Sequence, residues 1–290
     1  ICTIMRKCVF SSIIFSFIIV LISCNDEREE SKTFVDVIDF TEIGEIHNAG
    51  LDYILANLEV GQTISRSLVT SKVHEIDVVL YRQINELSAQ YIDQLIMNQG
   101  AGVQSAFKQY GGKSKLLSDI VAIDNSSLEV DNTSEVLSKE ANNFLSHFQR
   151  ILDSQYENDI DLQNQLDLLV ALANQQFITD EDKMILLPAM SVGKYSFQYW
   201  NDNVRKWGQK FEVYNYNMTD EVRSKIWKSD VAGGAVAGLH LWFSGTGAAL
   251  AAAGPSGWTA IGMIIAGKAL QASACALLVS IWSDQGKVAL

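Results

Sequence analysis

Cysteine and proline are scarce in this 290-residue sequence, which contains four cysteines and two prolines. Only Cys275 lies beyond the first 24 residues. A single cysteine can form neither an intramolecular disulfide nor a zinc site of paired cysteines, so the sequence excludes both after residue 24. The shortage of proline and the lack of runs that alternate apolar and polar residues favour an all-α fold.

Basic residues are also in the minority. The chain has 22 Lys and Arg against 34 Asp and Glu, a formal net charge of −12. Nucleic-acid binding depends on Lys and Arg that neutralise phosphates, so this balance argues against a nucleic-acid partner. The same charge should repel anionic lipid surfaces.

Motifs that carry catalytic or ligand-binding chemistry are missing as well. The four histidines are far apart in the sequence: His47, His74, His147 and His240. There is no paired-histidine zinc motif, phosphate-binding loop or Gly-x-Ser-x-Gly elbow. We therefore predict no catalytic residue, no metal site and no cofactor. A hydrolase whose site is assembled from distant residues is the alternative that one sequence leaves open.

The N-terminus carries a clear targeting pattern. Met5, Arg6 and Lys7 form a basic start, residues 8–22 are apolar, and Leu-Ile-Ser-Cys at 21–24 resembles the lipobox of bacterial lipoproteins. The resemblance implies that residues 1–23 are a signal peptide and that Cys24 is acylated, which anchors the chain in membrane lipid. The alternatives are an uncleaved signal anchor and a secretory signal with ordinary cleavage.

Residues 24–33 form a short polar segment rich in acids. It resembles the acidic export signal behind the lipidated cysteine of surface lipoproteins in the Bacteroidetes. This resemblance implies an outer-membrane lipoprotein of the bacterial cell envelope, exposed at the cell surface. A plain tether that holds the body away from the membrane explains the segment too.

Residues 34–228 are expected to form an acidic, all-helical body, because apolar residues recur there at every third or fourth position. Thr179, followed by three acids, is typical of a helix start. His47, beside Asn48, is interpreted as a partly buried histidine with a hydrogen-bond partner. Tyr199 and Trp200 are expected to pack in the core. The main helices predicted span residues 43–58, 72–98, 134–152, 158–177, 179–207 and 222–228.

Residues 229–283 are rich in Gly and Ala and almost free of charge, and residues 284–290 follow as a short tail. The turn-forming cluster at 254–257 divides the stretch into apolar segments 231–253 and 258–282. Each is long enough to cross a membrane. We predict a helical hairpin packed through small residues at the spacing of a GxxxG motif. The packing residues are Gly234, Gly238, Gly245 and Ala249.

The surroundings of this hairpin are open to three interpretations. The favoured one is membrane association, with Lys268 turned toward the partner helix, because a central Lys costs about 2.5–3.5 kcal/mol in lipid. The second is a soluble protein whose Gly/Ala-rich helices form its buried core. The third is a segment that is soluble until it meets a membrane.

Three sequence stretches carry a family resemblance: residues 47–52, 185–200 and the Asp-Val-Ala-Gly-Gly-Ala run at 230–235. They resemble a group of Bacteroidetes lipoproteins of unknown function. The Gly/Ala-rich tail is also similar in composition to pore-forming bacteriocins. The resemblance implies a non-enzymatic binding or structural module in the cell envelope, and it indicates no protein partner.

Overall fold

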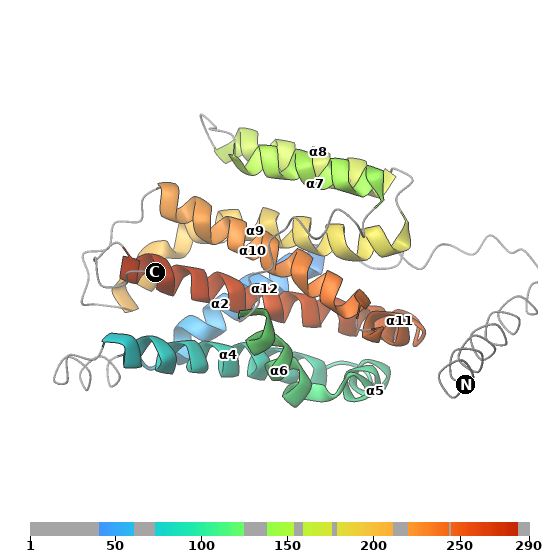
Figure 1. The fold of residues 1–290 in the computed structure, drawn as a ribbon, viewed down its shortest axis with the longest axis horizontal. Helices are drawn as coiled ribbons and strands as arrows, with labels where there is room; N and C mark the ends of the chain where they lie inside the picture. The colour runs from blue at the N-terminus through green and yellow to red at the C-terminus, as the bar shows by residue number, and fades with distance from the viewer. Residues whose placement is uncertain are drawn as a thin grey trace, which may run out of the picture. The chain divides into compact units, whose positions relative to one another are not determined.

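The computed structural model describes residues 41–60, 73–124, 138–153, 159–175, 179–210, 220–243 and 245–283 (Figure 1). These ranges are almost entirely α-helical and contain no strand, which confirms the all-α prediction. They belong to one compact unit, residues 37–290. The helices are α2 (Thr41–Asn57), α4 (Val73–Met97), α5 (Ala101–Tyr110), α6 (Gly112–Asp124), α7 (Lys139–Asp153), α8 (Asp159–Gln175), α9 (Asp180–Lys210), α10 (Asp220–Phe243), α11 (Thr246–Ala251) and α12 (Pro255–Ser283).

Helix α12 is the core helix of this unit. It contacts α2, α4, α5, α6, α9, α10 and α11 (Figure 1), and every residue from 260 to 271 is buried. By length and composition Pro255–Ser280 could cross a membrane, but 89% of its most apolar 18-residue window is buried against the protein. A helix that is apolar on all sides has to be enclosed, and here the other helices enclose it.

Three glycines of α12, five residues apart, allow three neighbouring segments to come close. A Cβ at Gly257 would overlap the carbonyl oxygen of Leu250, at the end of α11. A Cβ at Gly262 would lie 3.0 Å from Cδ1 of Ile43 on α2, and one at Gly267 would lie 2.7 Å from Cγ1 of Ile92 on α4. The absence of side chains at these positions thus sets how tightly α12 is wrapped.

Helix α10 lies between α9 and α12 and uses two adjacent glycines to reach both. A Cβ at Gly233 would lie 2.7 Å from Cβ of Ala272 on α12, whereas one at Gly234 would lie 3.2 Å from Cα of Ala189 on α9. Helices α7 and α8 contact each other and α9. Among the side chains that the structure describes there, the buried apolar ones are Ala141, Phe144, Phe148 and Ile151 of α7 and Leu166 and Leu169 of α8.

The C-terminal stretch differs in detail from the predicted hairpin. Helix α10 begins at Asp220 and runs through the expected boundary at residue 228. The predicted apolar segment 231–253 is divided between two helices, α10 and α11, because Gly245 adopts a left-handed φ of +69° between them. The turn comes at residues 252–254, earlier than predicted, since Pro255 is the first residue of α12. The predicted signal peptide, tether and residues 284–290 lie outside the described ranges.

Candidate functional site

A cluster of polar side chains is enclosed where α2, α9, α10 and α12 meet. His47 of α2 and Asp230 of α10 are both fully buried, and His47 Nε2 lies 3.9 Å from Asp230 Oδ2. Ionisable groups are rarely buried so completely unless they share a proton or a hydrogen bond. The pair is therefore the most unusual feature of the described core, and we build the site around it.

The carboxylate of Asp230 is held by donors from two other helices. Ser196 Oγ donates a hydrogen bond to Asp230 Oδ2, and the indole Nε1 of Trp200 lies 3.1 Å from the same oxygen. Trp200 Nε1 is also 3.2 Å from Ser273 Oγ on α12, and Ser273 itself hydrogen-bonds to Asp230. The cluster thus fixes α9, α10 and α12 against one another.

The neighbours of His47 determine which ring nitrogen carries its proton. Asn48 Nδ2 donates to the carbonyl oxygen of Tyr195 at 2.9 Å, so Asn48 Oδ1 must face the ring, where it is 3.1 Å from His47 Nδ1. An amide oxygen only accepts, so Nδ1 carries the hydrogen and Nε2 presents a lone pair toward Asp230. A protonated carboxyl at Asp230 complements that lone pair.

Burial shifts the pKa values of the pair in opposite directions. It lowers the pKa of His47 to about 4, against a smaller rise from the hydrogen bond to Asn48. It raises the pKa of Asp230 to about 7, although the hydrogen bonds from Ser196, Ser273 and Trp200 act the other way. Between these two values the imidazole is neutral and the carboxyl holds the proton.

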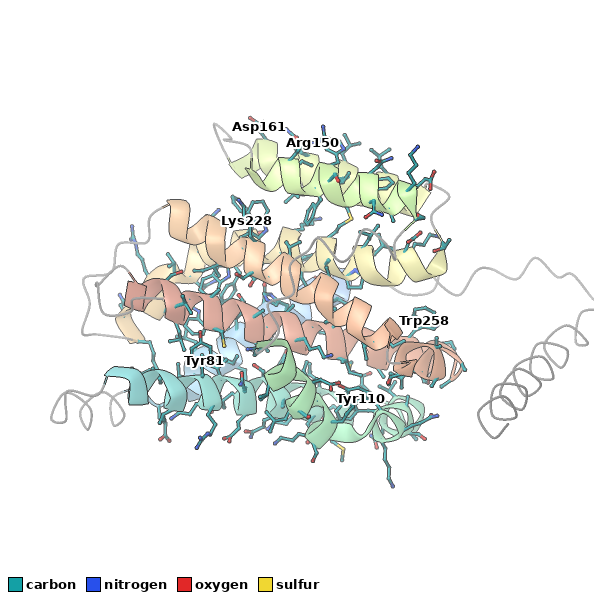
Figure 2. The ribbon with its side chains drawn as sticks, in the orientation of Figure 1. Tyr81, Tyr110, Arg150, Asp161, Lys228 and Trp258 are labelled. Atoms are coloured by element: carbon teal, nitrogen blue, oxygen red, sulfur yellow. The ribbon has the colours of Figure 1, made fainter. Side chains whose placement is uncertain are left out.

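A second buried ionisable group lies farther along α12. Lys268 Nζ is 3.7 Å from Asp119 Oδ2 on α6. Asp119 also accepts hydrogen bonds from Lys115 and from Tyr110 of α5, whose hydroxyl is 2.6 Å away. Tyr110 is labelled in Figure 2. Burial lowers the pKa of Lys268 to about 8 despite the charge of Asp119. Burial raises the pKa of Asp119, but the bonds from Lys115 and Tyr110 outweigh it and leave that pKa lowered.

The partner of Lys268 differs from the prediction. Its side chain reaches Asp119 of α6, so the expected orientation toward the partner helix of the hairpin is wrong. The carboxylate of Asp119 makes this burial tolerable, because burying the ammonium without one would cost several kcal/mol.

The four predicted packing residues do not share one interface. Gly234 faces Ala189 of α9, and Gly238 is buried within α10. Gly245 and Ala249 are exposed, so they do not pack the hairpin as predicted. Gly245 instead separates two helices. Cys24 lies outside the described residues.

Several functional candidates were missed in the sequence. Three of them are glycines of α12, Gly257, Gly262 and Gly267, and their spacing of five is the signal that could have found them. Asp230 is the last acid before the apolar stretch, and an isolated carboxylate there was a sign of a specific partner. His47 was correctly expected to have a hydrogen-bond partner, and it is fully buried.

The arrangement is suited to holding a proton in the core and not to attacking a substrate. Ser196 donates to Asp230, and the protonated nitrogen of His47 faces Asn48, so the serine is not paired with the imidazole as in a catalytic triad. His47, Asp230, Ser196 and Ser273 all have 0% exposure. Within the described ranges, no group of three His, Cys, Asp or Glu is placed to hold a metal ion.

No protein-family model, curated protein or solved structure matches the chain. The resemblance to Bacteroidetes lipoproteins therefore stays a prediction from the sequence.

Proposed function

We propose that this protein is a non-enzymatic lipoprotein of the bacterial outer membrane, attached through Cys24, whose helical body is a binding or structural module built around α12. In this proposal the lipid provides the membrane attachment, and α12 is a core helix. The observation that carries the core role of α12 is its enclosure by seven other helices, and the lipid attachment rests on the Leu-Ile-Ser-Cys motif at 21–24.

The polar side chains of α12 support its role as a core helix. Lys268 pairs with Asp119, Ser273 is bonded to Trp200, and Gln271 Nε2 lies 3.2 Å from Cys275 Sγ within the same helix. The first two partners belong to α6 and α9, so a move of α12 alone into lipid would separate both contacts. An unpaired central Lys costs about 2.5–3.5 kcal/mol in a membrane.

The lipid anchor is supported by the lipobox alone, and metabolic labelling with a palmitate analogue tests it. We expect the native chain to be labelled and Cys24→Ser to lose the label. Cys275→Ser is the matched control and should keep it, because that thiol is buried. Labelling that persists in Cys24→Ser would remove the anchor from the proposal.

The role of α12 is tested on protein that begins at residue 25 and has no lipid. We expect it to stay in the supernatant when it is sedimented with vesicles of phosphatidylethanolamine and phosphatidylcholine, which carry no net charge and do not repel the acidic chain. Truncation after residue 228 should abolish cooperative urea unfolding, because it removes α11, α12 and most of α10. Truncation after residue 283 is the control and should unfold cooperatively.

The same experiment identifies the competing function, a membrane-active protein whose C-terminal helices insert into lipid. That function is favoured only by the length and apolar composition of Pro255–Ser280. Sedimentation with vesicles, together with cooperative unfolding of the protein truncated after residue 228, would establish it in place of the core role.

A further inference from the structure

The pairing of His47 and Asp230 has a consequence for how the protein responds to acid. The two groups face each other at 3.9 Å, both with 0% exposure, and the described side chains bonded to them are neutral: Asn48, Ser196, Trp200 and Ser273. Among the described residues, His47 Nε2 and Asp230 Oδ1 have no hydrogen-bond partner. Among the described side chains, no charged group hydrogen-bonds to either member of the pair.

Two other titratable side chains on these helices, Tyr199 and Lys268, have partners outside the pair. Tyr199 of α9 donates to Asp52 of α2 at 3.0 Å, and burial raises the pKa of that tyrosine, so it stays neutral in acid. Lys268 of α12 is paired with Asp119 of α6. Neither contact supplies a proton or a counter-charge to His47 or Asp230.

We propose that His47 and Asp230 act as a one-proton unit, so that the pair's own contribution to the folding stability of the body is nearly independent of pH in mild acid. A buried pair of this kind is electrically neutral only when it holds one proton. It can do so as a carboxylic acid facing an imidazole or as a carboxylate facing an imidazolium. In both forms the proton count is the same.

Proton counting on the two sides of the folding equilibrium gives the expected behaviour. In the unfolded chain between about pH 4 and 6.5, the carboxylate is charged and the imidazole holds the one proton. In the folded chain, the pKa of Asp230 is about 7 and that of His47 about 4, so over the same range the carboxyl holds the one proton. Stability changes with pH only when the two states bind different numbers of protons. Folding therefore moves the proton between residues without net uptake.

Single substitutions should expose opposite pH dependences that cancel in the native chain. In His47→Gln, the raised pKa of Asp230 makes the folded state bind an extra proton, so stability is present in acid and is lost from about pH 4 to 7. In Asp230→Asn, the lowered pKa of His47 makes the folded state bind fewer protons, so stability is lost as pH falls from about 6.5 to 4. Each unfolding constant should change by up to about tenfold per pH unit.

Urea unfolding of the full chain, followed by circular dichroism at half-unit steps from pH 4.5 to 7.5, tests the proposal. The double variant His47→Gln/Asp230→Asn measures the contribution of all other groups. We expect the native chain to run parallel to the double variant and the two single variants to deviate with opposite signs. A native chain that deviates from the double variant by tenfold or more, or single variants that deviate with the same sign, would overturn the proposal.

A spectroscopic measurement covers the case in which a single variant does not fold. The ¹⁵N shifts of the imidazole in the native chain should show His47 with hydrogen on Nδ1 and constant between pH 5 and 7. The exposed His147 is the internal control for a solvent-accessible imidazole. A His47 signal that changes protonation within this range would contradict the one-proton unit.

Discussion

Replacing Lys268 by Met tests whether the buried ion pair of α12 stabilises the body or only makes its burial tolerable. Lys268 is 1% exposed and lies 3.7 Å from Asp119. Buried ion pairs are often no more stable than apolar side chains of similar size, because removal from water costs more than the attraction returns. We expect Lys268→Met to be more stable than the native protein at pH 7.

The pKa of Lys268 gives the magnitude. A fall from 10.5 to about 8 means that the folded protein disfavours the charged form by about 3 kcal/mol, at about 1.4 kcal/mol per pKa unit, with the attraction of Asp119 already included. After the substitution Asp119 retains its hydrogen bonds from Tyr110 and Lys115. The free energy of unfolding should therefore rise by about 2–3 kcal/mol at pH 7.

The pH dependence provides a second, independent sign. Because the folded pKa lies below the unfolded one, the unfolded chain binds more protons between about pH 8 and 10.5, so native stability rises with pH in that window. The variant lacks this rise. Burial also raises the pKa values of Tyr91, Tyr110 and Tyr199. These shifts make native stability fall with rising pH, but only as the pH approaches the pKa of free tyrosine, about 10.

Urea unfolding followed by circular dichroism from pH 7 to 9.5 measures both effects. Lys115→Met is the matched control, because its side chain is 42% exposed and bonds to the same carboxylate. Its removal should lower stability by no more than about 1 kcal/mol. If Lys268→Met is less stable than the native protein at pH 7, or keeps the rise above pH 8, the ion pair is a net source of stability and the reasoning is wrong.

Two further predictions concern packing, both measured by urea unfolding. Gly257→Ala should lower the free energy of unfolding by about 3 kcal/mol or more, because its Cβ would overlap a backbone carbonyl. Gly100→Ala is the control: a Cβ there has no atom within 4 Å, so the substitution should lower the free energy of unfolding by at most about 1 kcal/mol. Leu166→Lys should detach α8 from the rest of the body, because the side chain of Leu166 is 0% exposed. Leu168→Lys is the control: its side chain is 61% exposed, so the free energy of unfolding should change by about 0.5 kcal/mol or less. Equal effects within either pair would contradict the described packing.

Local features of the fold could be predicted from the sequence because their causes are local. Thr179 was expected to start a helix, and its Oγ1 accepts from the backbone N–H of Asp182 at 3.1 Å while Asp182 Oδ2 accepts from the N–H of Thr179 at 3.2 Å. Helix α4 (Val73–Met97) matches the span expected from its apolar period. Trp200 is fully buried, as predicted.

The pairings between helices could not be predicted in the same way. Nothing near Lys268 indicates that its carboxylate is Asp119, and nothing near His47 indicates Asp230, because the helices that carry these groups are separated by much of the chain. The surroundings of α12 were equally hidden, since an enclosed core helix and a membrane span share length and composition.

The glycine prediction failed for a geometric reason. The predicted pairs, Gly234 with Gly238 and Gly245 with Ala249, have a spacing of four, which keeps both residues on one helix face for a single partner. Gly257, Gly262 and Gly267 are five apart, and at about 100° per residue each step turns them by about 140°. They therefore face three different neighbours, as a helix wrapped on all sides requires.

The position of α12 in the chain also affects when the body can fold. All seven helices that it contacts precede it in the sequence, so they leave the ribosome before the helix that they enclose has been made. Until then, apolar side chains such as Ile43 and Ile92 lack the surface that buries them. A nascent chain in that state exposes apolar surface and is prone to aggregate. Such long-range contacts also slow folding, which lengthens the time for which this apolar surface is exposed.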